Sequence, residues 1–135
     1  MKIEVKGTDD VKRLLDEIAP RHALNIQRAA VHGVAGEVRN LIRKNAPKDE
    51  GALRKGIKTK RRRMSFGRIQ SDVVSEEFYW AFHERGTSKH GATPFVMPSV
   101  HEIELRLPAI LKEQFVKKFE AAIRRAKRRQ TKKGR

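Results

Sequence analysis

The 135-residue sequence contains no cysteine, which excludes disulfide bonds, thiolate metal sites and cysteine nucleophiles. No stretch approaches the ~20 apolar residues that a membrane-spanning helix needs. The N-terminal residues also lack the apolar run of a signal peptide. These absences predict a soluble, single-domain chain that is intracellular at synthesis and has no membrane partner.

Acidic residues are nearly absent from two segments. Residues 54–68 hold eight basic residues and no acid, and residues 117–135 hold ten basic residues against Glu120 alone. Because the net charge of the chain is +16, these two segments account for the whole excess and the remainder is close to neutral. Such clustering indicates a polyanionic neighbour or an acidic protein surface.

Patterns of catalytic chemistry are missing as well. There is no Gly-rich phosphate loop, nucleophile elbow or Walker-type motif, and the histidines do not cluster with acids at metal-ligand spacing. They are spread over different predicted elements: His22, His32, His83, His90 and His101. We therefore expect no catalytic residue, cofactor, metal or small-molecule substrate. A basic nuclease of toxin type would need His32 or His83 beside a carboxylate.

The N-terminal half is predicted to be helical. Apolar residues recur at i, i+3, i+4 and i+7 over residues 21–45, which is typical of an amphipathic helix. A short edge strand over residues 2–6 and a short helix over residues 11–18 are expected before it. Gly33 and Gly36 each weaken the long helix, so we expect a packed neighbour to approach closely on their face.

The middle of the chain predicts a β-hairpin. Residues 57–63 and 68–74 read as two strands around a turn that contains Gly67. The first strand is too basic for both faces to be buried, so it should be an edge or line an opening. Residues 48–56 read as a loop with one helical turn. Residues 76–85 carry four aromatic side chains and predict a third strand or a short helix on the core.

A long helix is expected to end the fold. Its apolar stripe begins after Pro98 and keeps helical phase through Pro108, which predicts one helix kinked at that proline. No apolar residue follows Ala126. We therefore expect one α+β domain over residues 1–127 and a basic disordered tail over residues 128–135. The predicted fold has short and long N-terminal helices, a small antiparallel sheet and a long kinked C-terminal helix.

Two motifs connect these elements. Residues 79–87 read Tyr-Trp-Ala-Phe-His-Glu-Arg-Gly-Thr, and after a polar loop residues 93–98 read Thr-Pro-Phe-Val-Met-Pro. Upstream, residues 46–57 read Ala-Pro-Lys-Asp-Glu-Gly-Ala-Leu-Arg-Lys-Gly-Ile. Over about residues 8–125 this order resembles the tail-component family of long-tailed bacteriophages, which includes head–tail junction and tail-completion proteins. In that family an aromatic-Ala-aromatic segment runs into Glu-x-Gly-Thr, and a variable loop leads to Pro-Phe-aliphatic-x-Pro.

The resemblance implies a structural virion protein of a tailed phage or prophage, and not an enzyme. Such a subunit would act in virion assembly as a head–tail connector, neck or tail-completion protein. It would form a homo-oligomeric ring at the head–tail junction or tail end, after synthesis in the host cytoplasm, and would contact neighbouring neck and tail proteins. The expected subunit interface comprises Tyr79, Trp80, Phe82, Glu84, Gly86, Thr87, Pro94, Phe95 and Pro98.

The basic segments have two interpretations each. The basic strand either lines a lumen and touches DNA phosphates without reading sequence, or is a solvated edge whose charges prevent aggregation. The C-terminal run either contacts DNA or an acidic partner, or only solubilises the chain. The candidate contacts are Lys58, Lys60, Arg61, Arg62, Arg63, Arg124, Arg125, Arg128 and Arg129. The charge alone favours the alternative function of a sequence-tolerant nucleic-acid-binding protein.

Glu84 and the loop over residues 88–92 also allow two interpretations each. Glu84 is either a buried or interfacial carboxylate or a surface acid beside a turn, and Thr87 is placed to cap that turn. The loop over residues 88–92 is either an arm that reaches a neighbouring subunit or a solvated connection.

Overall fold

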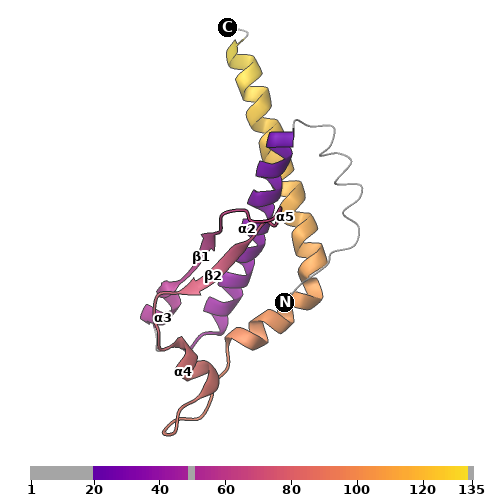
Figure 1. Cartoon of the computed structure of the whole chain (residues 1–135). Coiled ribbons are helices and arrows are strands. Elements are labelled where there is room, and N and C mark those ends of the chain that lie inside the picture. The colour runs from indigo at the N-terminus through magenta and orange to yellow at the C-terminus, as the bar shows by residue number, and fades with distance from the viewer. Residues whose placement is uncertain (1–19, 49–50, 134–135) are drawn as a thin grey trace.

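The computed structural model describes residues 20–48 and 51–133, so the strand and short helix expected over residues 2–6 and 11–18 lie outside the described residues. The elements follow in the order α2 (Pro20–Asn45), α3 (Gly51–Gly56), β1 (Ile57–Arg61), β2 (Ser71–Ser75), α4 (Trp80–Arg85) and α5 (Val96–Lys133). Figure 1 shows these helices and a small antiparallel sheet, which confirms the predicted α+β class.

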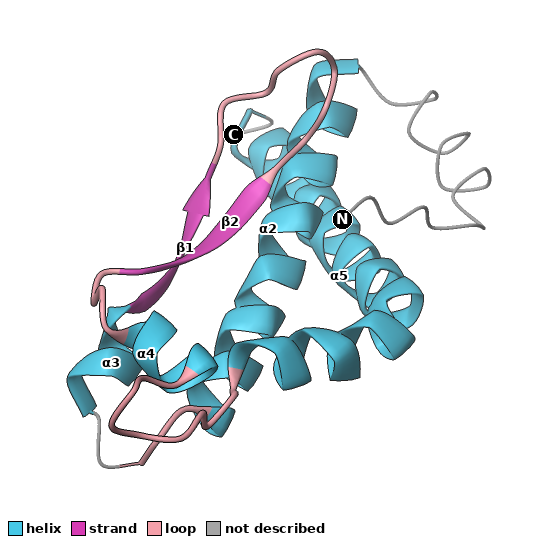
Figure 2. Ribbon diagram, turned by 60° about the horizontal axis from the view of Figure 1, so that its bottom comes forward, coloured by secondary structure: helices cyan, strands magenta, loops and turns pink. Residues whose placement is uncertain are grey.

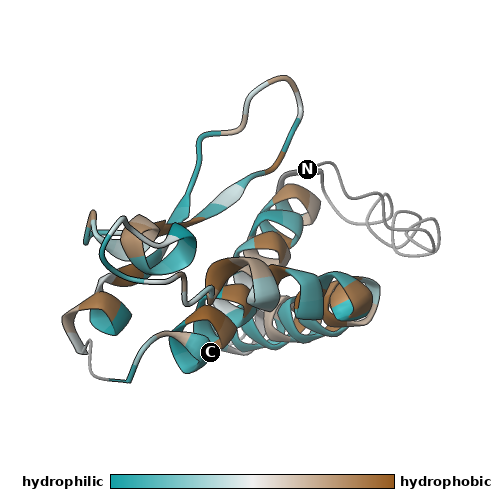
Figure 3. Ribbon diagram, turned by 90° about the horizontal axis from the view of Figure 1, so that it is seen from below, coloured by the Kyte–Doolittle hydropathy of each residue, from teal (hydrophilic) through white to brown (hydrophobic). Residues whose placement is uncertain are grey.

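Helix α2 is the central element. The hairpin packs on one side of it and α5 on the other, as the views in Figures 1 and 2 both show. Near the beginning of α2, Ala23 and Ile26 pack against Phe115 and Phe119 from late in α5, so the two long helices run antiparallel. Brown and teal alternate along both helices in Figure 3, as expected for helices that bury only one face.

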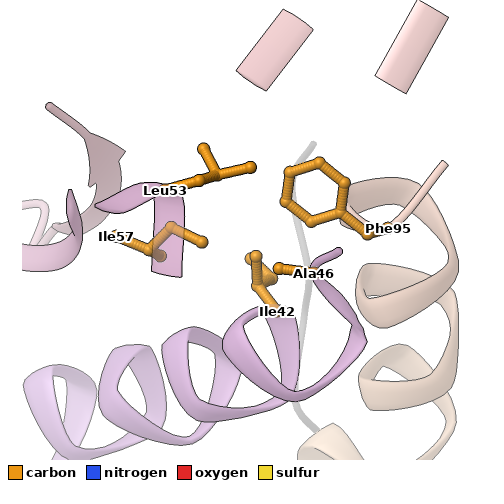
Figure 4. Close-up of a cluster of buried hydrophobic side chains, with 5 residues drawn as sticks. All are labelled: Ile42, Ala46, Leu53, Ile57 and Phe95. Carbon is orange, nitrogen blue, oxygen red and sulfur yellow. The ribbon is translucent and has the colours of Figure 1, made fainter. Parts of the chain in front are cut away.

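The main core lies where α2 ends. Segments that are far apart in the sequence contribute to it, and Leu53 is fully buried there while Phe95 is 2% exposed. Figure 4 shows the five buried side chains of this cluster: Ile42, Ala46, Leu53, Ile57 and Phe95. The core therefore joins the end of α2, the turn of α3, the start of β1 and the residue that precedes α5.

The two glycines of α2 have different surroundings. A Cβ added at Gly33 would lie 2.2 Å from Oε1 and 2.9 Å from Cδ of Gln114 on α5, so the expected close neighbour is present there. Gln114 is buried, and its Nε2 donates to Glu37 at 3.3 Å. At Gly36 the nearest atom is Nη2 of Arg39 at 3.8 Å. The close approach predicted for Gly36 was therefore wrong, because the neighbouring atom belongs to a side chain of α2 itself and not to a packed element.

The hairpin is present but its strands are shorter than predicted. Its antiparallel register runs from the pair Ile57 and Ser75 to the pair Arg61 and Ser71. Beyond Arg61 one more backbone bond continues the ladder, and the tip turns through Phe66 at φ 51° and Gly67 at φ 69°. The strands end early because the isolated bridge between Ser65 and Arg68 beside the turn is one residue out of register with the ladder that ends at Arg61 and Ser71, so the first strand holds one extra residue, as in a β-bulge.

The aromatic segment forms helix α4 and not a third strand. The hydroxyl of Ser75 accepts the N–H of Glu77 at 3.2 Å, which turns the chain away from the sheet as β2 ends. Tyr79 and Trp80 are half-buried against the main core. Phe82 is 52% exposed, so the aromatic side chains divide between the core and the surface.

Helix α5 is continuous from Val96 to Lys133 and contains Pro108, as predicted. Figure 1 shows a change of direction in its first half, consistent with the backbone hydrogen bond that a proline removes. The helix includes residues 128–133, while the domain bounds of residues 1–127 and the basic tail over residues 128–135 stay predictions. Lys, Arg and Gln are good helix formers, and extending an existing helix costs far less than starting one.

Within residues 20–48 and 51–133, no helix combines the length and the apolar character needed to cross a lipid bilayer.

Replacing Leu53 by alanine should destabilise the fold by about 2–5 kcal/mol, because it leaves a cavity in the main core. Leu105 is the matched control, since it lies on α5 and is 89% exposed; its replacement by alanine should change stability by less than about 0.5 kcal/mol. Urea unfolding of both variants measures the difference. Equal effects would contradict the core described above.

The two glycines provide a second stability test. Gly36→Ala should stabilise the protein by about 0.5–1 kcal/mol, because alanine favours the helix and meets only an ordinary contact there. Gly33→Ala should lack this gain, since Gln114 must leave its position and its bond to Glu37. Thermal unfolding measures the stability of the two variants. A larger gain in stability from Gly33→Ala than from Gly36→Ala would refute the packing of α5 on α2.

Candidate functional site

Glu84 of α4 holds the beginning of α5. Its Oε2 accepts the backbone N–H groups of Phe95 at 2.8 Å and Val96 at 2.9 Å, and its Oε1 accepts that of Met97 at 2.9 Å. The first turn of a helix has N–H groups without partners inside the helix. Pro98 has no N–H to satisfy, so Glu84 and Pro98 together account for the start of α5.

These contacts also set the charge of Glu84. Partial burial raises the pKa of a carboxyl group, but the hydrogen bonds from Met97, Val96 and Phe95 stabilise the anion, and the net effect is a pKa of Glu84 below its ordinary value. The positive end of the helix dipole favours the same ionised state. Glu84 is therefore a structural carboxylate that links the aromatic segment to the double-proline motif.

The first turn of α5 is tied to α2 as well. Ser99 is fully buried, and its hydroxyl donates to the carbonyl of Phe95 and accepts from Nδ2 of Asn45 at 2.9 Å. The upstream motif plays a similar part, since Arg54 donates to the carbonyl of Ala46 at 3.0 Å. Both motifs therefore serve to fix the junction of α2, α3 and α5.

Gly86 occupies a position that a side chain would obstruct. Its φ is +79°, and an added Cβ would lie 2.8 Å from the backbone nitrogen of Ala92. Its N–H donates to the carbonyl of Phe82 at 2.9 Å, which ends α4. Glycine is favoured here because of both the left-handed backbone and the close approach.

Thr87 organises the loop that follows. Its N–H donates to the carbonyl of His90 at 2.8 Å, and its hydroxyl accepts the N–H of His90 at 3.1 Å. The loop then returns to α4, because the N–H of Thr93 donates to the carbonyl of His83 at 2.7 Å. Thr87 thus caps the turn as expected, and hydrogen bonds tie both ends of the loop to α4.

The predicted interface residues fall into two groups. Phe95 is in the core, Tyr79 and Trp80 pack against it, and Glu84, Gly86 and Thr87 are used in hydrogen bonds within the chain as described above. Phe82, Pro94 and Pro98 remain exposed. Two further exposed side chains border this region and were not on the predicted list: Phe78, 78% exposed, and Met97, 51% exposed.

Phe78 and Phe82 form an exposed aromatic pair. Their ring centroids lie 6.0 Å apart in an edge-to-face arrangement, and Phe78 meets the half-buried Tyr79 in the same way at 5.8 Å. Edge-to-face contacts of this kind hold rings in defined orientations. The sequence signal for Phe78 was its i, i+4 spacing to Phe82 along one helical face, just outside the motif.

The predicted cations of the hairpin also fall into two groups, those paired with an acid of the chain and those without such a partner. Lys58 pairs with Glu76 at 2.7 Å, and Arg62 pairs with Asp72 on the facing strand. Within the described part of the chain, no acid pairs with the exposed side chains of Lys60, Arg61 and Arg63. The C-terminal candidates Arg124, Arg125, Arg128 and Arg129 are also exposed on α5.

His32 is surrounded by cations. Its Nδ1 lies 3.3 Å from the hydroxyl of Ser71 on β2. Burial, followed by repulsion from Arg61, Arg39 and Lys118, lowers the pKa of His32 below 6.5. The carboxylate partner that a nuclease site would need at His32 is not found among the described residues. Those residues also hold no group of three or more potential metal ligands.

Glu84→Gln should lower stability by about 1–3 kcal/mol near pH 7, because the charge-assisted hydrogen bonds to α5 are weakened. Since the pKa of Glu84 is lowered in the folded protein, its contribution is present above the unfolded pKa and is lost as the pH falls through the folded pKa. The variant should therefore lose less stability than the wild type upon acidification. Urea unfolding between pH 3 and pH 7 measures this, with Glu113→Gln on the exposed side of α5 as the control; parallel pH profiles for wild type and Glu84→Gln would contradict this role.

Comparison with known proteins places residues 6–86, which include the upstream motif and most of the aromatic motif, in a family. Residues 6–86 match the family described as "Bacteriophage HK97-gp10, putative tail-component". No curated protein and no solved structure matches the chain. The match includes α2, the hairpin, α4 and Glu84, and it confirms the resemblance that the motifs indicated. The chain belongs to the HK97-gp10-like family of bacteriophage tail components.

Proposed function

We propose that this tail-component protein is a subunit of the head–tail junction or of the tail-completion complex and assembles as a homo-oligomeric ring. The observation that carries the proposal is the exposure of large apolar side chains at separate sites of one small subunit. Large exposed apolar patches on soluble proteins mark surfaces that another molecule covers.

The first site is the aromatic pair Phe78 and Phe82, next to the first turn of α5 with Met97. The second is the hairpin tip, where Phe66 is fully exposed and Met64 is 41% exposed. The chain passes from the base of the hairpin into α4, so the two sites lie at opposite ends of the hairpin (Figure 1). At about 3.3 Å per residue, the strand and its tip separate them by roughly 25–30 Å.

Two different apolar sites at opposite ends suit a head-to-tail contact. In such a contact one patch of each copy meets a different patch of the next, and a rotation that closes produces a ring. The aromatic pair is held on a rigid backbone, because the hydrogen bonds of Glu84 and Thr87 fix the chain around Phe82 before any partner binds. This preorganisation favours a role of the pair in a contact between subunits. The neighbouring neck and tail proteins would cover the remaining surface, and the work would be done by burial and shape, without catalysis.

A nucleic-acid-binding protein that acts as a monomer is the competing function. The unpaired Arg61 and Arg63 favour it, but it gives no reason for the exposure of Phe66, Phe78 and Phe82. The two functions predict different results when the apolar sites are changed. Only the proposed junction subunit should then fail to join heads to tails.

Phage carrying Phe78→Ser with Phe82→Ser should produce separate heads and tails. Loss of an aromatic residue at an interface centre typically costs about 2 kcal/mol or more, or roughly thirty-fold in the contact. Phe66→Ser should have the same effect from the other end. Electron microscopy of lysates, with infectious titre, measures the outcome.

Leu105→Ser is the control, since this exposed leucine belongs to neither site. Circular dichroism of each purified variant establishes that it is folded. Joined, infectious particles in both aromatic variants, or in a phage from which the gene is deleted, would reject the proposed function.

A further inference from the structure

The hairpin presents positive charge that the chain does not neutralise. Residues 60–68 are exposed at nearly every position, and four cations there have no acid partner among the described residues: Lys60, Arg61, Arg63 and Arg68. A solvated edge strand needs only a few charges to prevent strand pairing. Lys58 on β1 and Arg62 directly after it are already in ion pairs, so the remaining cations exceed that requirement.

Helix α5 carries a basic face of its own. At 100° per residue, seven of its later cations fall within an arc of about 140°, and Lys127 lies outside it. The seven are Lys117, Lys118, Arg124, Arg125, Arg128, Arg129 and Lys132. Glu113 and Glu120 project outside this arc, and Phe115 and Phe119 lie next to it on the side that packs against α2. The face is roughly 23 Å long at 1.5 Å per residue.

The hairpin and α5 bring these charges together across α2. His32 lies on α2 within hydrogen-bonding distance of Ser71 on β2, and its imidazole is influenced by Arg61 from β1 and Lys118 from α5. The hairpin tip and the C-terminal half of α5 point toward the same end of the molecule in Figures 1 and 2. Segments separated by about fifty positions in the sequence therefore form a single surface.

We propose that this composite basic surface, formed by residues 60–68 of the hairpin, Arg39 of α2 and the basic face of α5, binds the phosphate backbone of duplex DNA without reading its sequence. The proposal deepens the proposed function, because it rests on a junction subunit being close to the packaged genome.

The chemistry of the surface favours a duplex over other polyanions. Most of its cations are arginines, whose planar guanidinium groups match phosphate oxygens in pairs. Duplex DNA carries one negative charge per ≈1.7 Å of axis, so a cationic face of this length can meet many phosphates. Single-strand binding relies on aromatic platforms between the cations. On α5 the aromatic residues beside the basic face, Phe115 and Phe119, are packed against α2, so among residues 60–68 and the basic face of α5 a single exposed aromatic ring, Phe66, lies between cations.

The test uses the full chain and a duplex of about 20 base pairs, in two unrelated sequences, with binding followed by fluorescence anisotropy. The wild type should bind both sequences equally, and its affinity should fall by about 10³–10⁵ between 50 and 200 mM salt if six to ten phosphates are contacted. The triple variant Arg61→Gln, Lys118→Gln, Arg125→Gln takes one cation from the hairpin and two from the basic face of α5. Its affinity should fall at least about tenfold, and the salt slope by about 0.9 for each lost contact.

A second triple variant provides the matched control. Lys55→Gln, Lys89→Gln and Lys112→Gln remove the same charge from exposed positions outside the surface, and binding should stay within about threefold of the wild type. Equal losses in the two variants would show that only net charge matters and would overturn the proposal. Tighter binding to single strands, or to poly-glutamate at equal charge, would overturn it as well.

His32 gives an independent measure of where DNA binds. Burial is the first cause of the lowered pKa of His32, and repulsion from Arg61, Arg39 and Lys118 follows it. Bound phosphate would offset the repulsion, so the pKa of His32 should rise when the duplex is added. NMR titration of the imidazole, assigned with His32→Gln, detects the shift; an unchanged pKa would contradict binding at this surface. Failure of particle assembly in the aromatic variants and loss of DNA binding in the basic variants are separate readouts, so either proposal can fail alone.

Discussion

The three hydrogen bonds from backbone N–H groups to Glu84 are the contact on which the arrangement of the C-terminal half depends. They join α4 to the first turn of α5 across a loop of about ten residues, and they act at the same place where the Phe95 side chain fills the core. The direction of α5 is therefore set by its first turn and not by the loop. The loop itself adds little to this constraint, since the carboxylate and the aromatic anchor carry it.

The elements that the sequence predicted best are the long helices, whose periodic pattern extends over many consecutive residues. Helical periodicity gave α2 within one residue at its beginning, and the stripe that continues through Pro108 gave a single α5. The hairpin was found from Gly67 and its flanking strands, but the ends of the strands were not, because they depend on a one-residue slip in register between the ladder and the bridge beside the turn. The choice between strand and helix for α4 also depended on tertiary contacts, since four aromatic residues suit either.

The candidate site was predictable only in part, because a motif shows which residue types recur and not what they touch. Glu84, Gly86, Thr87 and Phe95 were assigned to an interface, whereas each has a partner inside the chain that explains its chemistry. No spacing rule connects a carboxylate to N–H groups eleven to thirteen residues later. Conversely, Phe78 and Met97 lie at positions where the motif does not specify the residue, and exposure alone distinguishes them.

The repulsion among the surface cations must be offset by packing elsewhere in the fold. Bringing Arg61, Arg39 and Lys118 around His32 costs electrostatic free energy, and the apolar contacts of α2 with α5 and the hairpin must offset that cost. A fold selected only for stability would place acids there, in the way that Glu76 pairs with Lys58 and Asp72 pairs with Arg62. Any anion that binds the folded chain reduces the repulsion and stabilises it by mass action. The unpaired charge is therefore an unfavourable term of the isolated subunit that an anionic partner would remove, in the same way that a neighbouring subunit would remove the exposure of the aromatic pair.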